Sequence, residues 1–460
     1  MIRKVLIANR GEIAVRIIRA CREMGIRTVA VCSEADRDAL HSQLADECIC
    51  IGAAPAKESY LKMERILSAA IASGADAIHP GFGFLSENAR FAGLCARCGL
   101  IFIGPSGDVI ERLGNKAAAR SCMMAAGVPV VPGSDGPTAS VQDALRLAES
   151  FGYPVIIKAS AGGGGRGMRV VRRREEFEES FLTAQAEARS AFGDGTMYLE
   201  KYVEHARHIE FQILGDMEGN VIHLGERDCS VQRRHQKLIE EAPAPGMSDE
   251  LRARMGADAV KAAKAAGYTG AGTVEFLLDS DQRYYFIEMN TRIQVEHGVT
   301  ELVTGIDLVK EQIRIASGEV LTLCQEDVSI RGHAMECRIN AEDPARDFIP
   351  CPGTVEELHI PGGNGIRVDT ALYPGYQIPP YYDSLLAKVM AVSPNREEAI
   401  LKLRSALGEL VIDGVTTNLD FQYQLLGDER FFAGGVDTGY VEAFLSMNMA
   451  APDDVKESEK

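Results

Sequence analysis

Residues 4–16 read Lys-Val-Leu-Ile-Ala-Asn-Arg-Gly-Glu-Ile-Ala-Val-Arg, which is a short apolar run, a polar turn and then apolar residues at helical spacing. The same alternation continues through the first hundred residues and predicts a parallel, doubly wound sheet. Such sheets carry their ligand loops at the carboxyl ends of the strands. The expected strands are residues 4–8, 28–32, 48–51, 76–79 and 100–104, with helices over 12–24 and 60–73.

Beyond this region the pattern changes to short strands, a glycine run and then strands that follow one another closely, at 209–214, 221–226, 273–278 and 284–289. Close spacing predicts an antiparallel sheet. We therefore predict an α/β protein with an N-terminal parallel-sheet domain, a small mobile lid domain and a C-terminal antiparallel-sheet domain. The predicted boundaries are 1–114, linker helices over 115–130, the lid over 131–203, the C-terminal domain over 204–446 and a disordered tail over 447–460.

Composition excludes several classes of protein. The 460 residues include 49 Lys and Arg against 66 Asp and Glu, a net charge of −17, which disfavours general binding to nucleic acid or anionic membranes. No apolar run reaches the roughly 18 residues that a spanning helix needs, and the N-terminus does not resemble a signal peptide. The 11 cysteines are scattered and odd in number, which is typical of reduced thiols. We expect a cytoplasmic enzyme.

The glycine run at residues 162–167 matches the pattern GxGxxG, but a dinucleotide fingerprint requires a helix after it. Here strands are expected on both sides, at 154–158 and 168–171, so the loop should cap a β-hairpin. Glycine backbone N–H groups can close around phosphate oxygens, and Lys158 and Arg166 supply positive charge. The loop is predicted to be a phosphate lid; a flexible surface loop is the alternative.

A second signal is a predicted hairpin between residues 273–278 and 284–289. If Asp281-Gln282 form a two-residue turn, Glu275 stands opposite Glu288, and Asn290 shares their face. Like charges placed opposite each other are destabilising unless a cation lies between them. Two carboxylates and an amide oxygen suit Mg²⁺. A solvated acidic pair is the alternative.

The segment that follows, residues 291–297, carries polar groups at every second position. If it is extended, Arg292, Gln294 and Glu296 share one side and form an anion clamp beside a possible general base. A solvated strand face is the alternative interpretation. Neither Arg338 nor Lys237 stands out by periodicity.

Together these motifs resemble the biotin carboxylases of the ATP-grasp superfamily, and the resemblance runs from residue 2 to about 443. It rests on residues 8–16, 79–88, 158–167, 288–297, 336–343 and 380–384. The resemblance implies that ATP and bicarbonate give carboxyphosphate, and that the carboxyl group then passes to N1′ of biotin.

The resemblance also implies roles for individual residues. Nucleotide contacts would be Lys116, Lys158, Gly163, Gly164, Gly165, Glu200, Lys201, Val203, His208, Gln232 and His235. Two Mg²⁺ or Mn²⁺ ions would bind Glu275, Glu288 and Asn290. Bicarbonate would contact Lys237, Arg292, Gln294 and the Val295 backbone. Glu296 would remove its proton, and Arg292 and Arg338 would stabilise developing negative charge.

Biotin would lie near Arg338 and Phe82, and the family commonly has tyrosine at the position of Phe82. Two further departures from the family pattern are Ala161 in place of a lid glycine and Gly298 in place of a proline. None of the three removes a charged group.

Biotin is carried on lysine in a Met-Lys-Met motif, which this chain lacks. We therefore expect the chain to work with a separate biotin carboxyl carrier protein and carboxyltransferase subunits, as in bacterial acetyl-CoA carboxylase for fatty acid synthesis. The resemblance also implies a homodimer. Pyruvate or propionyl-CoA as final acceptor is an open alternative. A carboxylate–amine ligase of the ATP-grasp superfamily, and a nucleotide-binding scaffold without turnover, are the remaining ones.

Overall fold

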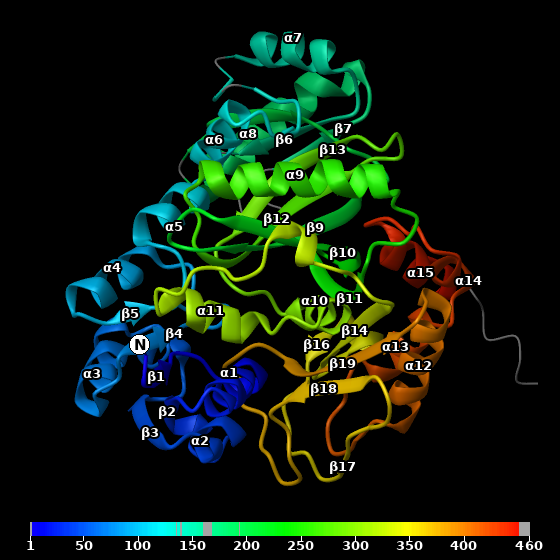
Figure 1. The fold of residues 1–460 in the computed structure, drawn as a ribbon. Coiled ribbons are helices and arrows are strands. Elements are labelled where there is room, and N and C mark those ends of the chain that lie inside the picture. The colour runs from blue at the N-terminus through cyan, green and yellow to red at the C-terminus, as the bar shows by residue number, and fades with distance from the viewer. Residues whose placement is uncertain (1, 135, 139, 160–167, 193, 450–460) are drawn as a thin grey trace, which may run out of the picture. The chain divides into compact units, whose positions relative to one another are not determined.

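The computed structural model describes residues 2–134, 136–138, 140–159, 168–192 and 194–449 (Figure 1). The chain divides into two compact units. The first consists of residues 1–122, 207–275 and 288–460, and the second of residues 123–206 and 276–287.

The first unit begins with a five-stranded sheet in the order β3-β2-β1-β4-β5, and every neighbouring pair in it is parallel. The predicted doubly wound sheet is therefore confirmed. Its strands are β1 Lys4–Ile7, β2 Arg27–Ser33, β3 Glu47–Gly52, β4 Ala77–His79 and β5 Ile101–Phe102. The Asn9 amide, just beyond β1, donates to the carbonyl oxygens of Pro80 (2.7 Å) and Phe82 (2.6 Å), and so joins the turns at the carboxyl ends of β1 and β4.

Helices follow these strands, and the two predicted over 12–24 and 60–73 are confirmed as α1 and α3, each of which buries an apolar stripe. The helices are α1 Gly11–Glu23, α2 Leu40–Leu44, α3 Met63–Ser73, α4 Ala89–Arg97, α5 Gly107–Gly114 and α6 Lys116–Ala125, with short 3₁₀ turns η1 Glu34–Asp36 and η2 Ala56–Glu58.

An eight-stranded sheet follows, in the order β13-β12-β9-β10-β11-β14-β19-β18. The pairs from β9 to β18 are antiparallel, as predicted. Its strands are β9 Arg207–Gly215, β10 Val221–Arg233, β11 Gln236–Ala242, β12 Gly270–Leu278, β13 Tyr284–Asn290, β14 His333–Asn340, β18 Ile366–Thr370 and β19 Leu385–Ser393.

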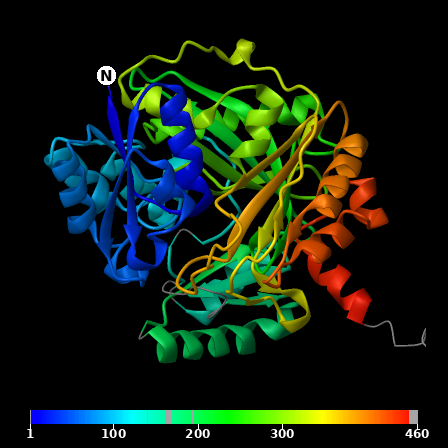
Figure 2. The same ribbon diagram turned by 90° about the horizontal axis from the view of Figure 1, so that it is seen from below.

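Strand alternation gives β14 and β19 two different faces. Cys337, Ile339 and Val389 pack in an apolar core with α12 and α13, whereas Glu336 and Arg338 point the other way. Helices α12 to α15 (orange to red) run along the apolar side (Figure 2), and α9 packs on β9 and β10 (Figure 1). These helices are α9 Asp249–Ala265, α10 His297–Thr304, α11 Leu308–Ala316, α12 Arg396–Glu409, α13 Leu419–Leu425, α14 Glu429–Ala433 and α15 Tyr440–Met449. Short elements complete the unit: η4 Gln325–Asp327, β15 Glu342–Asp343, η5 Pro344–Arg346, β16 Ile349–Pro350, β17 Leu358–His359 and β20 Val411–Ile412.

The second unit contains an antiparallel sheet in the order β7-β6-β8, covered by two helices. Its elements are α7 Val141–Phe151, β6 Val155–Ala159, β7 Met168–Val171, η3 Arg174–Glu176, α8 Phe177–Phe192 and β8 Met197–Lys201. Strands β6 and β7 pair directly, so the predicted hairpin is confirmed. The glycine loop that joins them, residues 160–167, lies outside the described residues.

The turn between β12 and β13 is longer than predicted. Asp279 closes it, because its N–H donates to Arg283 O (2.9 Å) and its carbonyl accepts from Gln282 N (3.1 Å). The loop therefore has three residues, with Gln282 at φ +60°, and the predicted two-residue turn is wrong. The predicted register of Glu275 with Glu288 thus does not follow from the turn.

Candidate active site

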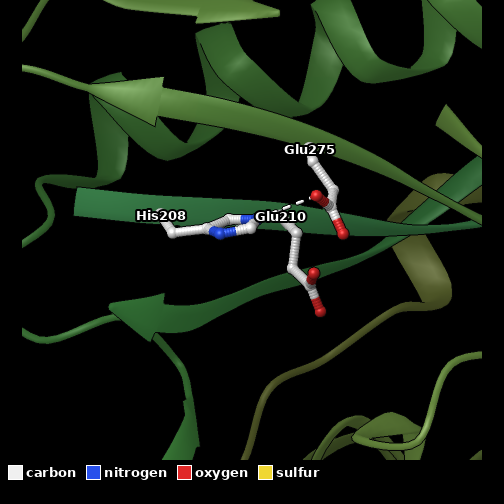
Figure 3. A group of neighbouring side chains, drawn as sticks. All are labelled: His208, Glu210 and Glu275. Atoms are coloured by element: carbon white, nitrogen blue, oxygen red, sulfur yellow. Dashed lines mark hydrogen bonds and ion pairs between the residues drawn. The ribbon is translucent and has the colours of Figure 1, made fainter. Parts of the chain in front are cut away.

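Polar side chains from four strands of the large sheet converge on its face opposite α12. Figure 3 shows His208 and Glu210, two residues apart on β9, beside Glu275 from β12. Two-residue spacing on a strand places side chains on one face.

Lys237 on β11 is the centre of this group. Its ammonium nitrogen lies 2.6 Å from Glu210 Oε2, 3.1 Å from Glu275 Oε1 and 2.6 Å from Glu296 Oε1. Burial lowers the pKa of Lys237, but the charges of Glu210, Glu275 and Glu296 outweigh burial and raise the pKa well above its usual value. Lys237 is therefore a permanent cation.

Arg338 on β14 continues the row of charges. Its Nη2 donates to Glu296 Oε2 (2.9 Å), and its Nε donates to Glu240 Oε1 (2.6 Å). Burial raises the pKa of Glu296, but Lys237 and Arg338 outweigh it and hold that pKa well below its usual value. Glu296 is thus an ionised carboxylate between two cations. For Glu240 burial prevails and raises the pKa to about 7.

Glu275 is the acceptor for the remaining polar groups. Its Oε1 accepts from Asn290 Nδ2 (2.8 Å) and Gln294 Nε2 (2.7 Å), and His208 Nε2 lies 3.0 Å from its Oε2. Burial raises the pKa of Glu275, but the charges of Lys237 and His208 bring it well below the usual value.

Glu288 completes the predicted metal ligands. Burial and the negative charge of Glu275 raise the pKa of Glu288, and the nearby charge of Lys116 only partly offsets them. Two carboxylates and an amide oxygen are hard donors of the kind that Mg²⁺ or Mn²⁺ prefers. Asn290 lies beside Glu275 (Nδ2 to Oε1, 2.8 Å) and Glu288 is within reach of the charge of Glu275, although the turn register from which the three residues were predicted is wrong.

The segment 291–297 is not extended, so that expectation is wrong. It is an irregular loop in which Glu296 is the N-cap of α10, with φ −80° and ψ 11°. Gln294 and Glu296 still point into the group around Lys237. Arg292 instead donates to Glu87 Oε2 (3.0 Å) and to Asn290 Oδ1 (3.0 Å).

Other predicted residues lie apart from this group or are engaged elsewhere. Gln232 and Lys237 face each other across the β10–β11 hairpin, while His235 is exposed in its turn at φ +65°. The Val295 carbonyl accepts from Lys388 Nζ (2.8 Å). Phe82 packs on the core around α1.

The remaining nucleotide residues lie in the second unit. Lys158 on β6 forms an ion pair with Glu200 on β8. Lys201 Nζ donates to the carbonyls of Gly152 (2.9 Å) and Tyr153 (3.0 Å), and Val203 is half-buried. The predicted phosphate contacts Gly163, Gly164 and Gly165 lie outside the described residues.

Sequence reasoning missed several residues of this site: Glu87, Glu210, Arg227 and Glu240. Arg227 and Glu210 are completely buried although they carry charge. A charged residue inside an apolar strand was the available signal, since β10 reads Val-Ile-His-Leu-Gly-Glu-Arg from residue 221. That signal does not say which partner compensates the charge.

This arrangement is matched by known proteins. Residues 1–110 match the family described as "Biotin carboxylase, N-terminal domain", residues 115–324 match "Carbamoyl-phosphate synthase L chain, ATP binding domain", and residues 336–443 match "Biotin carboxylase C-terminal domain". The chain is 58% identical to Biotin carboxylase 1 of Bacillus subtilis over 96% of its own length and 99% of that protein. It is 54% identical to a pyruvate carboxylase subunit of Methanothermobacter thermautotrophicus, over 96% and 90% of the two chains.

Solved structures agree. The biotin carboxylase domain dimer of Hydrogenobacter thermophilus 2-oxoglutarate carboxylase, in complex with MgADP, ADP and bicarbonate, is 53% identical with a TM-score of 0.90, and the match covers 98% of this chain and 100% of that one. A biotin carboxylase from Campylobacter jejuni is 50% identical with a TM-score of 0.90, over 96% and 99% of the two chains. Fold and site define an ATP-grasp enzyme, an ATP-dependent ligase. The chain belongs to the biotin carboxylase family.

Within the described residues, we find no helix that combines the length and the apolar character needed to span a bilayer.

Proposed function

We propose that this chain carboxylates biotin on a separate carrier protein with ATP and bicarbonate, as the first half-reaction of an acetyl-CoA carboxylase. The observation that carries the proposal is the ionised Glu296 held between Lys237 (2.6 Å) and Arg338 (2.9 Å) on a buried face of the sheet. The two cations are suited to bind a small anion, and the carboxylate between them is suited to accept its proton.

In the proposed mechanism, bicarbonate binds to Lys237 and Arg292 and to the amide of Gln294. Bicarbonate would draw part of the Lys237 charge away from Glu296, and so raise the low pKa of Glu296 towards the range in which a general base works. Glu296 then takes the bicarbonate proton, and the resulting oxyanion attacks the γ-phosphorus of ATP. The bond from this phosphorus to the bridging oxygen breaks, and ADP leaves. Arg338 stabilises the charge that develops on carboxyphosphate and on the biotin ureido oxygen.

Glu275, Glu288 and Asn290 would hold the divalent cations, which reduce repulsion between bicarbonate and the triphosphate. Lys116 would add positive charge beside Glu288. Lys158 and the loop 162–167 would cover the phosphates, and Glu200, Lys201 and Val203 would contact adenine. His208, Gln232 and His235 would contact the ribose and the rest of the nucleotide, and Phe82 would adjoin biotin.

The test is phosphate release from Mg·ATP, with and without bicarbonate and free biotin, alongside transfer of labelled bicarbonate to biotin. We expect biotin to stimulate phosphate release only when bicarbonate is present, and labelled carboxybiotin to form. Phosphate release that requires an amine and ignores biotin would instead identify a carboxylate–amine ligase. ATP binding without turnover would identify a scaffold.

We further propose a cytoplasmic homodimer that works with a biotin carboxyl carrier protein and carboxyltransferase subunits. The eleven free thiols are compatible with a reducing compartment. Pyruvate is a second candidate acceptor, because the pyruvate carboxylase subunit of Methanothermobacter thermautotrophicus is 54% identical to this chain. Identification of the transferase that co-purifies with the chain separates the two acceptors. The domain boundaries 1–114, 115–130, 131–203, 204–446 and 447–460 remain part of this proposal.

A further inference from the structure

Arg227 on β10 is a completely buried arginine next to the site, and every N–H of its guanidinium has an acceptor. The five hydrogen bonds run from Nε to Glu210 Oε1 (2.5 Å), from Nη1 to Gln212 Oε1 (2.8 Å) and Thr300 Oγ1 (2.9 Å), and from Nη2 to Thr273 Oγ1 (3.2 Å) and Gln294 Oε1 (2.8 Å). A guanidinium has five N–H donors and no acceptor, so this one is saturated and cannot itself contact a substrate.

Arg227 at the oxygen and Glu275 at the nitrogen together fix the orientation of the Gln294 amide. Because Arg227 can only donate, the Gln294 amide must turn its oxygen towards Arg227 and its NH₂ group away from it. One N–H of that group donates to Glu275 Oε1 (2.7 Å). Within the described part of the chain the second N–H makes no hydrogen bond to the protein, so it can donate to a bound anion.

Arg227 also sets the position of Lys237 through Glu210. Glu210 stands directly opposite Arg227 in the β9–β10 ladder, and its two oxygens are divided between the two cations. The charges then alternate along one row: Arg227, Glu210, Lys237, Glu296, Arg338 and Glu240. Arg227 is one end of this row and Glu240 is the other, and both are completely buried.

We propose that Arg227 is a positioning residue for bicarbonate: it holds the Gln294 amide in the one orientation that presents N–H to the anion. This inference rests on the proposed function of the site and deepens it. A purely structural role would be to hold β9, β10 and α10 together, and it predicts a loss of stability with no selective effect on bicarbonate.

The first variant is Arg227→Lys, in the full-length protein. Lysine keeps the charge beside Glu210 but lacks the planar fork that reaches Gln294. We expect KM for bicarbonate to rise about tenfold, as for the loss of a hydrogen bond to a charged group, with Kd for Mg·ATP unchanged. Thr300→Val is the matched control, because Thr300 lies in α10 and its hydroxyl accepts from Nη1 of the same guanidinium, whereas Gln294 accepts from Nη2. This variant should leave KM for bicarbonate unaltered.

A double-mutant cycle with Gln294→Ala then decides the matter. If Arg227 acts through Gln294, the Arg227→Lys change should alter bicarbonate KM by less than about twofold in the Gln294→Ala background. Independent effects that multiply in the double variant overturn the inference, as does an Arg227→Lys enzyme with normal bicarbonate KM.

Should Arg227→Lys not fold, Gln294→Glu tests the other half of the inference, the role of the Gln294 N–H, with Arg227 intact. The new carboxylate still accepts from Arg227 but offers no N–H, so bicarbonate KM should rise at least as far as in Gln294→Ala; a normal KM overturns the inference. Wild-type protein that forms no carboxybiotin refutes the proposed function itself, which is a different outcome from a normal KM in an active variant.

Discussion

Strand β1 of the parallel sheet and one face of the eight-stranded sheet bury opposite kinds of side chain. In the parallel sheet, β1 is enclosed by apolar side chains, and Val5, Leu6 and Ile7 are all completely buried. In the eight-stranded sheet, one face is equally apolar, but the other buries Glu210, Arg227 and Glu240 without exposure. Buried charges cost folding free energy unless each is paired and hydrogen-bonded. The apolar side chains of β1 stabilise the fold, whereas the charged face is retained at a cost in stability for the chemistry it performs.

The largest effect is expected when Glu296, the central carboxylate of the charged face, is removed. Glu296→Ala should lower bicarbonate-dependent ATP cleavage by about 10²- to 10⁴-fold, the usual contribution of a general base. Nucleotide binding should be almost intact, because the variant leaves Glu275 and Glu288 unchanged. Steady-state kinetics and a nucleotide titration measure the two quantities.

The control for that variant is Glu250→Ala, an exposed glutamate in the first turn of α9, which should change neither quantity. If Glu296→Ala also loses nucleotide binding, Glu296 has a structural role.

The complementary change is made in the parallel sheet. Ile7→Ala empties space in a core where Ile7 is fully buried, and should lower the free energy of unfolding by about 2–5 kcal/mol. KM for bicarbonate and for ATP should not change in the folded fraction. Urea denaturation followed by kinetics checks both statements. Ile71→Ala on α3, where the side chain is 59% exposed, should cost less than about 0.5 kcal/mol.

A third variant reverses a charge at the proposed metal site. Glu288→Lys places an ammonium where a cation should bind, and like charges brought together cost several kcal/mol, so Mg·ATP affinity should fall at least about 100-fold. Isothermal titration with Mg·ATP measures the change. The exposed Glu319→Lys has the same change in net charge and should bind Mg·ATP normally. Unchanged affinity in Glu288→Lys would refute the metal assignment.

The smallest effect concerns acid sensitivity in the parallel sheet. Burial, helped by the charge of Arg16, lowers the pKa of His79 to about 3, and its Nδ1 accepts from Gly81 N (3.1 Å). The folded state therefore binds fewer protons than the unfolded state below the ordinary histidine pKa of about 6.5, and stability should fall as the pH drops from there towards 3.

His79→Asn keeps an acceptor for Gly81 and removes the titration. Between about pH 7 and about pH 5, this variant should lose about 2 kcal/mol less stability than the wild type. Urea denaturation at the two pH values tests this, with the exposed His359→Asn as control. An equal loss in wild type and His79→Asn would show that other groups dominate acid unfolding.

The positions of the strands and helices along the chain were predicted more accurately than the turns and contacts between them. The strands of the parallel sheet were predicted to within about two residues, because apolar runs and helical spacing are local signals. The β12–β13 turn was mispredicted, since Gln282 adopts a positive φ that its residue type does not announce. The anion clamp was predicted on the condition that residues 291–297 are extended, but α10 begins at His297, and Glu296 occupies its N-cap position without a side-chain capping bond.

By itself, the sequence determined the order of strands and helices, the separation into a parallel and an antiparallel sheet, and the residue types from which the site is made. Only the tertiary structure decided that Arg227 meets Glu210. The β9–β10 register shifts between His223 and Glu226, around Gly225 at φ +83°; strict pairing from His223 with Ile213 would place Arg227 opposite Ile209. A one-residue shift turns a side chain to the other face of a sheet, and a bulge makes this shift through contacts between strands. The periodicity of one strand does not depend on its contacts with another strand. The pairing of Arg227 with Glu210, and with it the buried row of charges, therefore could not be predicted from the sequence.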